Sequence, residues 1–198
     1  MTTIYFVRHA EPVHGWADDR TRPLTREGEK DSVKVTEVLH EVAFDYAVSS
    51  PYKRSIDTIK ECAIDHGIII ETDERFRERE KGKDGNVYGM FQKRWADFDF
   101  REEGGESLRM VQKRNMEGLK RLLWSHNSET ILFGTHGTAF STILNYYDPS
   151  YDCNRFLKII DYMPYVVKMM FHGTACIGKE EILIIKKEFT GEIRANKV

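Results

Sequence analysis

Two histidines and two arginines stand out because each lies beside the end of an apolar, strand-like segment. His9 comes directly after the first such segment, and Arg8 immediately precedes it. His136 follows the fourth segment, and Arg54 lies one helical turn beyond the second. In an open parallel sheet, the carboxyl ends of the strands form the ligand-binding edge. We therefore expect these four side chains to meet at one site.

This combination of side chains suits the chemistry of a phosphoryl group. Arginine presents a rigid planar fork of donors that matches phosphate oxygens and keeps its positive charge. Imidazole is a nucleophile towards phosphorus, and a cationic environment keeps the ring unprotonated at neutral pH. Two arginines can stabilise the charge on a phosphoryl group during transfer. A carboxylic acid is then needed to protonate the leaving alkoxide.

The elements that must position these residues follow from the apolar pattern. Strands are predicted at residues 3–7, 46–48, 68–70 and 130–133, with two later strands at 165–171 and 182–185. Helices are predicted after Thr25 as N-cap, from Pro51 to a stop at Gly67, over residues 107–125, and directly after residue 138. Strands that alternate with helices indicate an α/β fold: a three-layer α/β/α sandwich with a mainly parallel sheet.

Residues 74–103 differ in composition from the rest of the chain. This segment holds eight basic and eight acidic residues, a content that we interpret as too charged for a core. It also carries five aromatic residues: Tyr88, Phe91, Trp95, Phe98 and Phe100. We interpret residues 1–198 as a single domain with a lid-like insertion at about 74–106, which packs over one edge and has a short helix near 87–98.

Composition excludes several classes of protein. The 198 residues include 30 basic and 32 acidic ones, a net charge of −2 that argues against a broad basic face for nucleic acid. No apolar run approaches the roughly 20 residues of a membrane span, and no signal peptide is visible. The three scattered cysteines are typical of reduced thiols, so we expect a cytoplasmic protein.

Six short motifs then carry a resemblance to a known family. They are R-H-A at 8–10, P-L-T-R-E-G at 23–28, S-S-P-Y-K-R-S-I-D-T at 49–58, F-R-E-R-E-K-G at 76–82, G-E-S at 105–107 and T-H-G at 135–137. In this order they resemble the histidine phosphatase superfamily, in the branch that includes phosphoglycerate mutase. The resemblance covers residues 4–138 and implies a phosphoglycerate mutase-like fold.

The resemblance also implies catalytic roles. His9 would be the nucleophile that forms a phosphohistidine. Arg8, Arg54 and His136, together with the backbone at Gly137, would bind the phosphoryl group. The family uses no metal for this reaction, and we expect neither a metal nor a cofactor here.

A glutamate of the fourth motif would act as the general acid and then as the general base. The spacing to Gly82 favours Glu78, and Glu80 is the alternative.

The loop after the nucleophile departs from the family pattern. Ala10 stands where the family has glycine, Pro12 where it has threonine or serine, and Gly15 where an asparagine is frequent. Proline offers neither a hydroxyl nor an N–H, so this loop must bind its ligand differently. Trp16 is followed by Ala17 rather than the asparagine usual in mutases. These departures favour a phosphatase over a mutase.

The leading hypothesis is therefore a metal-independent phosphatase that hydrolyses a small phosphomonoester through a phosphohistidine intermediate. The alternatives are phosphoryl transfer of the mutase type and non-catalytic binding of a phosphorylated ligand. We expect a small phosphorylated metabolite as partner and neither nucleic acid nor membrane. The sequence leaves open whether the chain forms a homodimer.

Overall fold

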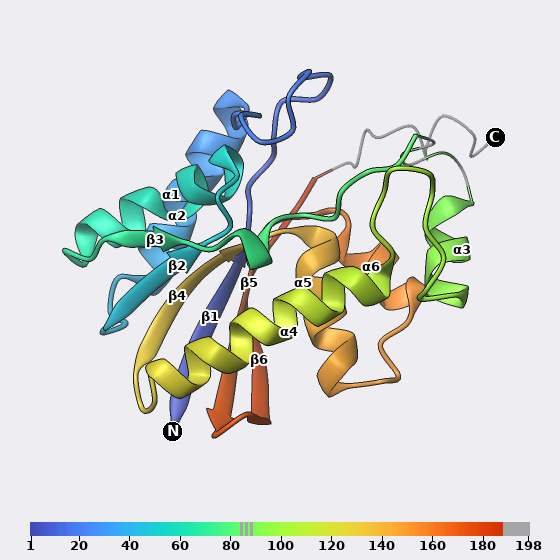
Figure 1. Cartoon of the computed structure of the whole chain (residues 1–198). Coiled ribbons are helices and arrows are strands. Elements are labelled where there is room, and N and C mark those ends of the chain that lie inside the picture. Colours follow the sequence, from blue (N-terminus) through green and yellow to red (C-terminus); the bar gives the residue numbers. More distant parts are fainter. Residues whose placement is uncertain (84, 86, 88, 188–198) are drawn as a thin grey trace.

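The chain forms one mixed sheet with helices on both of its faces (Figure 1). The computed structural model describes residues 1–83, 85, 87 and 89–187. The strands are β1 (Thr2–Arg8), β2 (Tyr46–Ser49), β3 (Ile70–Thr72), β4 (Thr130–Thr135), β5 (Tyr162–His172) and β6 (Ala175–Lys186). The helices are α1 (Arg26–Leu39), α2 (Lys53–Asp65), α3 (Met90–Ala96), α4 (Leu108–Ser125), α5 (Gly137–Tyr147) and α6 (Cys153–Ile159), with a 3₁₀ turn η1 (Glu74–Phe76).

The strand order is β3-β2-β4-β1-β5-β6. The first four strands in this order run parallel, whereas β5 is antiparallel to β1 and β6 is antiparallel to β5. The expected mainly parallel sheet is therefore confirmed. The antiparallel hairpin of β5 and β6 extends the sheet away from the parallel strands.

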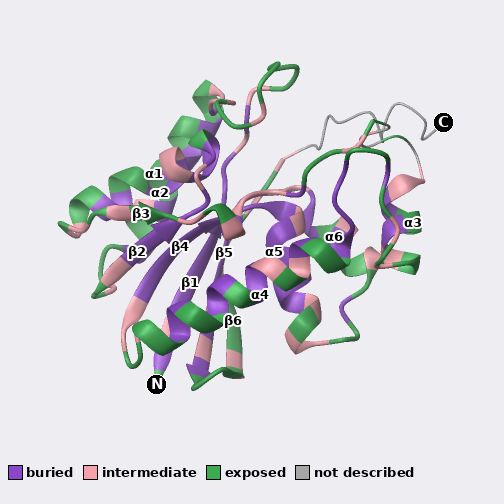
Figure 2. Cartoon of the chain, viewed as in Figure 1, coloured by how far each residue is buried: buried purple, intermediate pink, exposed green. Residues whose placement is uncertain are grey.

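Alternation along β1 explains why both faces of the sheet are covered. Ile4 and Phe6 belong to a core cluster that includes residues of α4, α5 and α6. Tyr5 and Val7 belong to a second cluster with residues of α1 and α2. All four side chains are buried, as successive residues of a strand point to opposite faces. Figure 2 shows the buried strands between the outer helices, which confirms the three-layer sandwich.

Element boundaries differ from the prediction at several places; β6, for example, spans Ala175–Lys186 rather than 182–185. Thr25 caps α1 as expected, accepting a hydrogen bond from the Gly28 N–H. However, α2 begins at Lys53 rather than Pro51, because the backbone is still extended at Tyr52. The third strand begins at Ile70 because the N–H of Ile68 bonds the carbonyl of Ala63 and so belongs to the C-terminal cap of α2.

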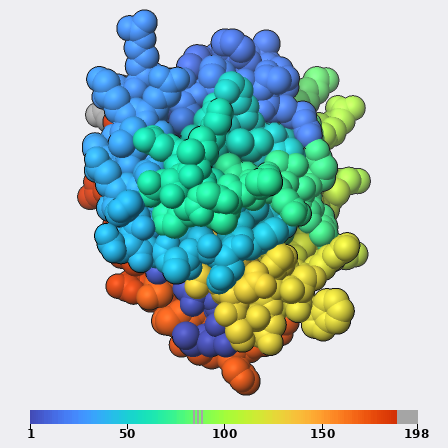
Figure 3. All heavy atoms as spheres, turned by 90° about the vertical axis from the view of Figure 1, so that its left-hand side faces the viewer, coloured from blue at the N-terminus to red at the C-terminus, as the bar shows by residue number. Residues whose placement is uncertain are grey.

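The strand β3 lies at the edge of the sheet. Viewed from that side, segments from the first eighty residues form most of the surface, with the end of α4 below them (Figure 3). None of the helices in the described part of the chain combines the length and apolar character that a membrane span requires.

The charged segment contributes to the core, contrary to the prediction. Arg79, Arg94 and Glu102 are almost fully buried, and Glu102 forms an ion pair with each arginine. The short helix is α3, and its Phe91 ring packs 5.1 Å from the ring of Phe156 in α6. Tyr88 lies outside the described residues. Opposite charges that neutralise one another can be buried together, which a count of charged residues does not reveal.

Candidate active site

The parallel register of β2, β4 and β1 brings the predicted site residues together. Arg8 at the end of β1 lies opposite Thr135 in β4, and Gly134 lies opposite Ser49 in β2. The residue after each strand therefore reaches the same edge of the sheet. The rings of His9 and His136 lie there with their centroids 5.3 Å apart.

His9 is buried and oriented by its own backbone. Its Nδ1 donates a hydrogen bond to the carbonyl of Ala10 at 2.8 Å, which leaves the Nε2 lone pair available. Burial, reinforced by the positive charges of Arg54 and Arg8, holds the pKa of His9 well below its ordinary value of 6.5. The ring is therefore neutral at pH 7 and can act as a nucleophile.

His136 is fully buried beside His9, and Ser50 orients it. The Ser50 Oγ accepts a hydrogen bond from the N–H of Tyr52 and lies 2.7 Å from His136 Nε2. The Ser50 hydroxyl can therefore donate its hydrogen to Nε2 of His136. Nδ1 of His136 has no hydrogen-bond partner among the described residues. Burial, followed by the charge of Arg54, holds the pKa of His136 well below 6.5. This arrangement leaves Nδ1 as a donor.

Carbonyl groups at the end of α6 hold the Arg8 guanidinium. Its terminal nitrogens donate to the carbonyls of Ile159, Ile160 (3.1 Å) and Tyr162 (3.0 Å). Nε is buried and has no partner among the described residues. Burial lowers the pKa of Arg8 to about 10, so the group stays cationic at neutral pH.

Arg54 is held in a similar way from the other side of the site. Its NH1 donates to the carbonyl of Asp19 at 2.6 Å and its NH2 to the Asp19 Oδ2 at 3.3 Å. Its Nε is also buried without a partner in the part of the chain that the structure describes. Both arginines thus keep a donor for a ligand while their terminal groups are fixed.

Glu78 lies at the N-terminus of α5, just beyond His136. Its Oε1 accepts the N–H of Ala139 at 3.0 Å and of Arg79 at 2.8 Å, and its Oε2 accepts the N–H of Thr138 at 3.1 Å. The otherwise unpaired N–H groups at the start of α5 thus hold the Glu78 side chain in place. Glu80, by contrast, is exposed.

A cavity of about 630 Å³ contains these groups. Arg8, His9, Arg54, Glu78 and Gly137 line it, whereas Glu80 does not. The structure therefore brings together the predicted nucleophile His9, both arginines and the first of the two candidate acids. His136 packs against the His9 ring but is not among the lining residues.

A family model described as the histidine phosphatase superfamily (branch 1) matches residues 4–160. The chain belongs to this superfamily. No curated protein sequence is significantly similar to it.

Solved structures share the fold, and two of the three described here are phosphatases. Bacillus stearothermophilus YhfR is 22% identical, with 98% of this chain and all of that chain covered and a TM-score of 0.72. A variant of phosphoserine phosphatase from Entamoeba histolytica bound to phosphoserine is 19% identical, with 92% and 97% covered and a TM-score of 0.75. Mycobacterial glucosyl-3-phosphoglycerate phosphatase with inorganic phosphate is 16% identical, with 93% and 97% covered and a TM-score of 0.72. The expected phosphoglycerate mutase-like fold is thus confirmed.

Three motif residues of the superfamily have a packing role in this chain. Thr58 Oγ1 accepts the N–H of Ala10 at 2.9 Å and so fixes the backbone after the nucleophile. A Cβ on Gly28 would lie 2.3 Å from the carbonyl oxygen of Glu11, and one on Gly137 would lie 3.2 Å from the Arg8 guanidinium. Gly28 is needed because the backbone of Glu11 approaches it closely, whereas a Cβ at Gly137 would require the Arg8 side chain to shift slightly.

Several residues of this histidine phosphatase site escaped sequence reasoning. Asp19 holds Arg54 and forms an ion pair with Arg22, whose distance is 2.7 Å. Arg22, His14 and Lys81 also line the cavity, together with Pro12 and Gly15 of the altered loop. The sequence had pointed to Pro12 and Gly15 through their departure from the family pattern, but no motif had assigned a role to the other residues. The cavity lining therefore holds more basic than acidic side chains.

No group of three or more His, Cys, Asp or Glu side chains within residues 1–83, 85, 87 and 89–187 is arranged to hold a metal ion.

Proposed function

We propose that this protein is a metal-independent phosphatase that hydrolyses a small phosphomonoester through phospho-His9. The observation that carries the proposal is the arrangement around Nε2 of His9. This nitrogen belongs to a neutral, buried ring whose pKa is lowered by burial and by the charges of Arg54 and Arg8, and the carboxyl group of Glu78 lines the same cavity. A nucleophile, charge stabilisation and an acid are the parts that phosphoryl transfer requires.

In the first step, Nε2 of His9 attacks phosphorus and a P–N bond forms. The bond between phosphorus and the leaving oxygen breaks, and its electron pair goes to that oxygen, which takes a proton from Glu78. The Nε groups of Arg8 and Arg54 donate to the phosphoryl oxygens, and the Nδ1 of His136 donates to them once the phosphoryl group is bonded to the adjacent His9 ring. These donors are already in place, so little reorganisation accompanies the transfer.

In the second step, water attacks the phosphohistidine. Glu78, now a carboxylate, takes a proton from this water as the P–O bond forms. The P–N bond breaks, its electron pair returns to Nε2, and inorganic phosphate leaves. One phosphomonoester and one water thus give one alcohol and one phosphate, and both catalytic groups return to their starting state.

The structural relatives support the phosphatase reaction and the size of the substrate. Phosphoserine and inorganic phosphate, which are bound in two of them, are small molecules. A cavity of about 630 Å³ in this chain has room for a leaving group of similar or somewhat larger size. Its basic residues beyond Arg8 and Arg54 favour a leaving group that carries negative charge.

The test is to trap the intermediate. The protein is mixed with 4-nitrophenyl phosphate in the presence of EDTA, quenched in alkali, and analysed by mass spectrometry of its peptides. We expect a phosphoryl group on the peptide that contains His9, stable in alkali and lost in acid, together with release of inorganic phosphate. His9→Ala should abolish both signals, whereas the matched control His172→Ala, at an exposed position at the end of β5, should keep them.

Each alternative has its own outcome. Loss of activity with EDTA, or a phosphoenzyme that persists in His9→Ala, would refute the mechanism. Binding of phosphate without turnover would indicate a non-catalytic ligand-binding protein. Transfer of the phosphoryl group to a second hydroxyl of the substrate, in preference to water, would indicate a mutase.

A further inference from the structure

The segment that carries the proposed acid, residues 77–80, has no regular secondary structure. It lies between η1 and α3, so neither a helix nor a strand ladder fixes its backbone. Yet proton transfer requires the Glu78 carboxylate within hydrogen-bond reach of the leaving oxygen. Side-chain contacts from elsewhere must therefore position this segment.

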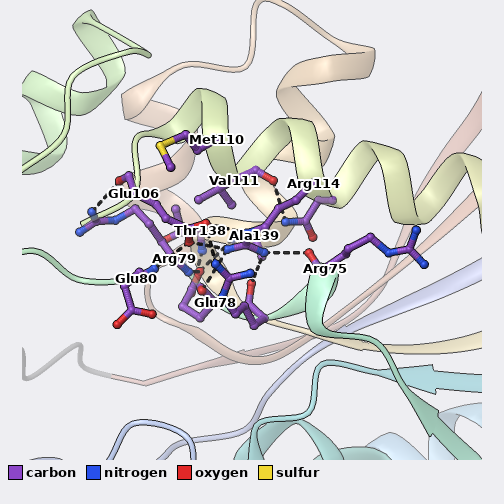
Figure 4. A network of polar contacts seen from close by, with 12 residues as sticks. Arg75, Glu78, Arg79, Glu80, Glu106, Met110, Val111, Arg114, Thr138 and Ala139 are labelled. Atoms are coloured by element: carbon purple, nitrogen blue, oxygen red, sulfur yellow. Dashed lines mark hydrogen bonds and ion pairs between the residues drawn. The ribbon is translucent and has the colours of Figure 1, made fainter. Parts of the chain in front are cut away.

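Arg114 of α4 supplies these contacts (Figure 4). Its NH1 donates to the carbonyls of Arg75 and Arg77, both at 2.8 Å, and its NH2 donates to the carbonyl of Glu78 at 3.1 Å. Its Nε and NH2 also donate to the two oxygens of Glu106, at 2.9 and 2.8 Å. All five N–H donors of the guanidinium are thus used, and three of them hold the backbone around Glu78.

Glu106 completes the arrangement from the other side. Besides Arg114, its carboxylate accepts the Glu80 N–H at 2.9 Å and the Arg77 guanidinium at 2.8 Å. Burial alone would raise the pKa of Glu106, but the hydrogen bonds from Arg114 and from the Glu80 backbone outweigh it and hold the pKa below the ordinary value. The charged pair therefore persists at neutral pH.

Close backbone packing makes this contact rigid. A Cβ on Gly105 would lie 2.7 Å from the backbone nitrogen of Gly82, and the Glu106 N–H bonds the carbonyl of Glu80 at 3.1 Å. Ser107 then caps α4 by accepting the Met110 N–H. The G-E-S motif thus joins the acid segment to the start of the helix that carries Arg114.

We infer that Glu106 and Arg114 are positioning residues for the acid Glu78. Neither residue lines the cavity; both act through the backbone of residues 75–80, whose placement sets where the Glu78 carboxylate meets the N-terminus of α5. The inference rests on the proposed phosphatase reaction and deepens it. It assigns to the pair an effect on proton transfer to the leaving group and none on attack by His9.

The test uses leaving groups that differ in their need for a proton. 4-Nitrophenyl phosphate leaves as a stable anion, whereas glycerol 1-phosphate needs protonation. The measured quantity is kcat/KM, since it covers the steps through transfer to His9 and excludes hydrolysis of the intermediate. Arg114→Lys has at most three donors and cannot span three carbonyls and a carboxylate.

We expect Arg114→Lys and Glu106→Gln to lower kcat/KM for glycerol 1-phosphate by roughly 10- to 100-fold, a fraction of the 10²- to 10⁴-fold that acid catalysis contributes. Their loss on 4-nitrophenyl phosphate should stay below about threefold. In a Glu78→Gln background, Arg114→Lys should cause little further loss on either substrate, because the acid is already absent. The matched control is Arg109→Lys, an exposed residue of the same helix that pairs with Asp99.

The outcomes separate positioning from a general structural role. Equal losses on the two substrates, or a loss in the double variant equal to the product of the single losses, would overturn the inference while the phosphatase reaction stands. Arg114→Lys and Glu106→Gln change different groups, so the inference can still be tested if one of these variants misfolds. Far-UV circular dichroism checks that each variant is folded. If the unsubstituted protein forms no phosphoenzyme with 4-nitrophenyl phosphate, both the proposed function and the inference fail.

Discussion

Replacing Glu102 with glutamine removes the carboxylate charge that lies between two buried arginines. Its Oε1 accepts the Nε of Arg94 at 2.7 Å, and its Oε2 accepts the NH1 of Arg79 at 3.1 Å. The three side chains are between 1 and 4% exposed, so water cannot replace the lost charge. Glutamine keeps the shape and one oxygen acceptor, and thus isolates the effect of charge.

The expected loss of stability follows from this burial. Removing one partner of a buried ion pair typically costs about 3–5 kcal/mol, and the retained acceptor places this substitution near 3 kcal/mol. In a domain of 150–250 residues, each kcal/mol corresponds to a fall of roughly 2–4 °C in Tm. We therefore expect the Tm of Glu102→Gln to fall by roughly 6–12 °C.

The assay is urea and thermal unfolding, followed by far-UV circular dichroism and tryptophan fluorescence. Glu103→Gln is the matched control, because the neighbouring Glu103 is 85% exposed and lies 4.0 Å from an exposed Lys83. Its effect should stay below about 0.5 kcal/mol. An unchanged denaturant slope would show that the substitution changes stability rather than the unfolded state.

The pH dependence supplies a second check. Burial raises the pKa of Glu102, but the hydrogen bond from Arg94 and the charge of Arg79 outweigh it and hold the pKa below 4.5. A carboxyl whose pKa is depressed by folding stabilises the protein above its unfolded pKa and loses that contribution as pH falls through the folded value. The difference between the two proteins should thus be full at pH 7 and shrink below pH 4.5. A difference under about 1 kcal/mol at pH 7 would refute the reasoning.

Three further substitutions or conditions test the site. Ser50→Ala removes the hydrogen bond to His136 and should lower kcat/KM about 5- to 10-fold while the protein stays folded. An unaltered kcat/KM would contradict the role of Ser50 in orienting His136. Because the pKa of His9 is depressed, kcat/KM corrected for substrate ionisation should hold as pH falls from 8 to 6.5; an acid limb centred at or above 6.5 would contradict a neutral buried ring. Gly28→Ala should destabilise the protein by about 1–3 kcal/mol in urea unfolding, because its Cβ would collide with the Glu11 carbonyl.

The convergence of His9 and His136 could be predicted from the sequence because it depends on local patterns. Short apolar runs indicate parallel strands, and the residue after such a strand lies at the ligand-binding edge by topology alone. Thr25 could be identified as a helix cap for the same reason, since capping involves neighbours three residues away.

The location of Glu78 could not be derived in this way. Its neighbour Glu80 has the same chemistry, and the motif spacing of the family was needed to favour one of them. What separates the two in the structure is that Glu78 binds the N-terminus of α5 and lines the cavity, whereas Glu80 is exposed. The burial of Glu102 and Arg94 was unpredictable for a related reason: it depends on which charges meet in space.

The end of α6 has a consequence for how the activity of this protein can be tuned. The carbonyls of Ile159, Ile160 and Tyr162 take three N–H donors of Arg8, so the direction in which its Nε points depends on where that helix stops. The same short helix contributes Phe156 to the cavity wall. Substitutions in α6 can therefore shift the proposed phosphate-binding Arg8 and reshape the proposed substrate cavity at once. For directed evolution of new substrate preferences, α6 offers a means of change that leaves the catalytic motifs untouched.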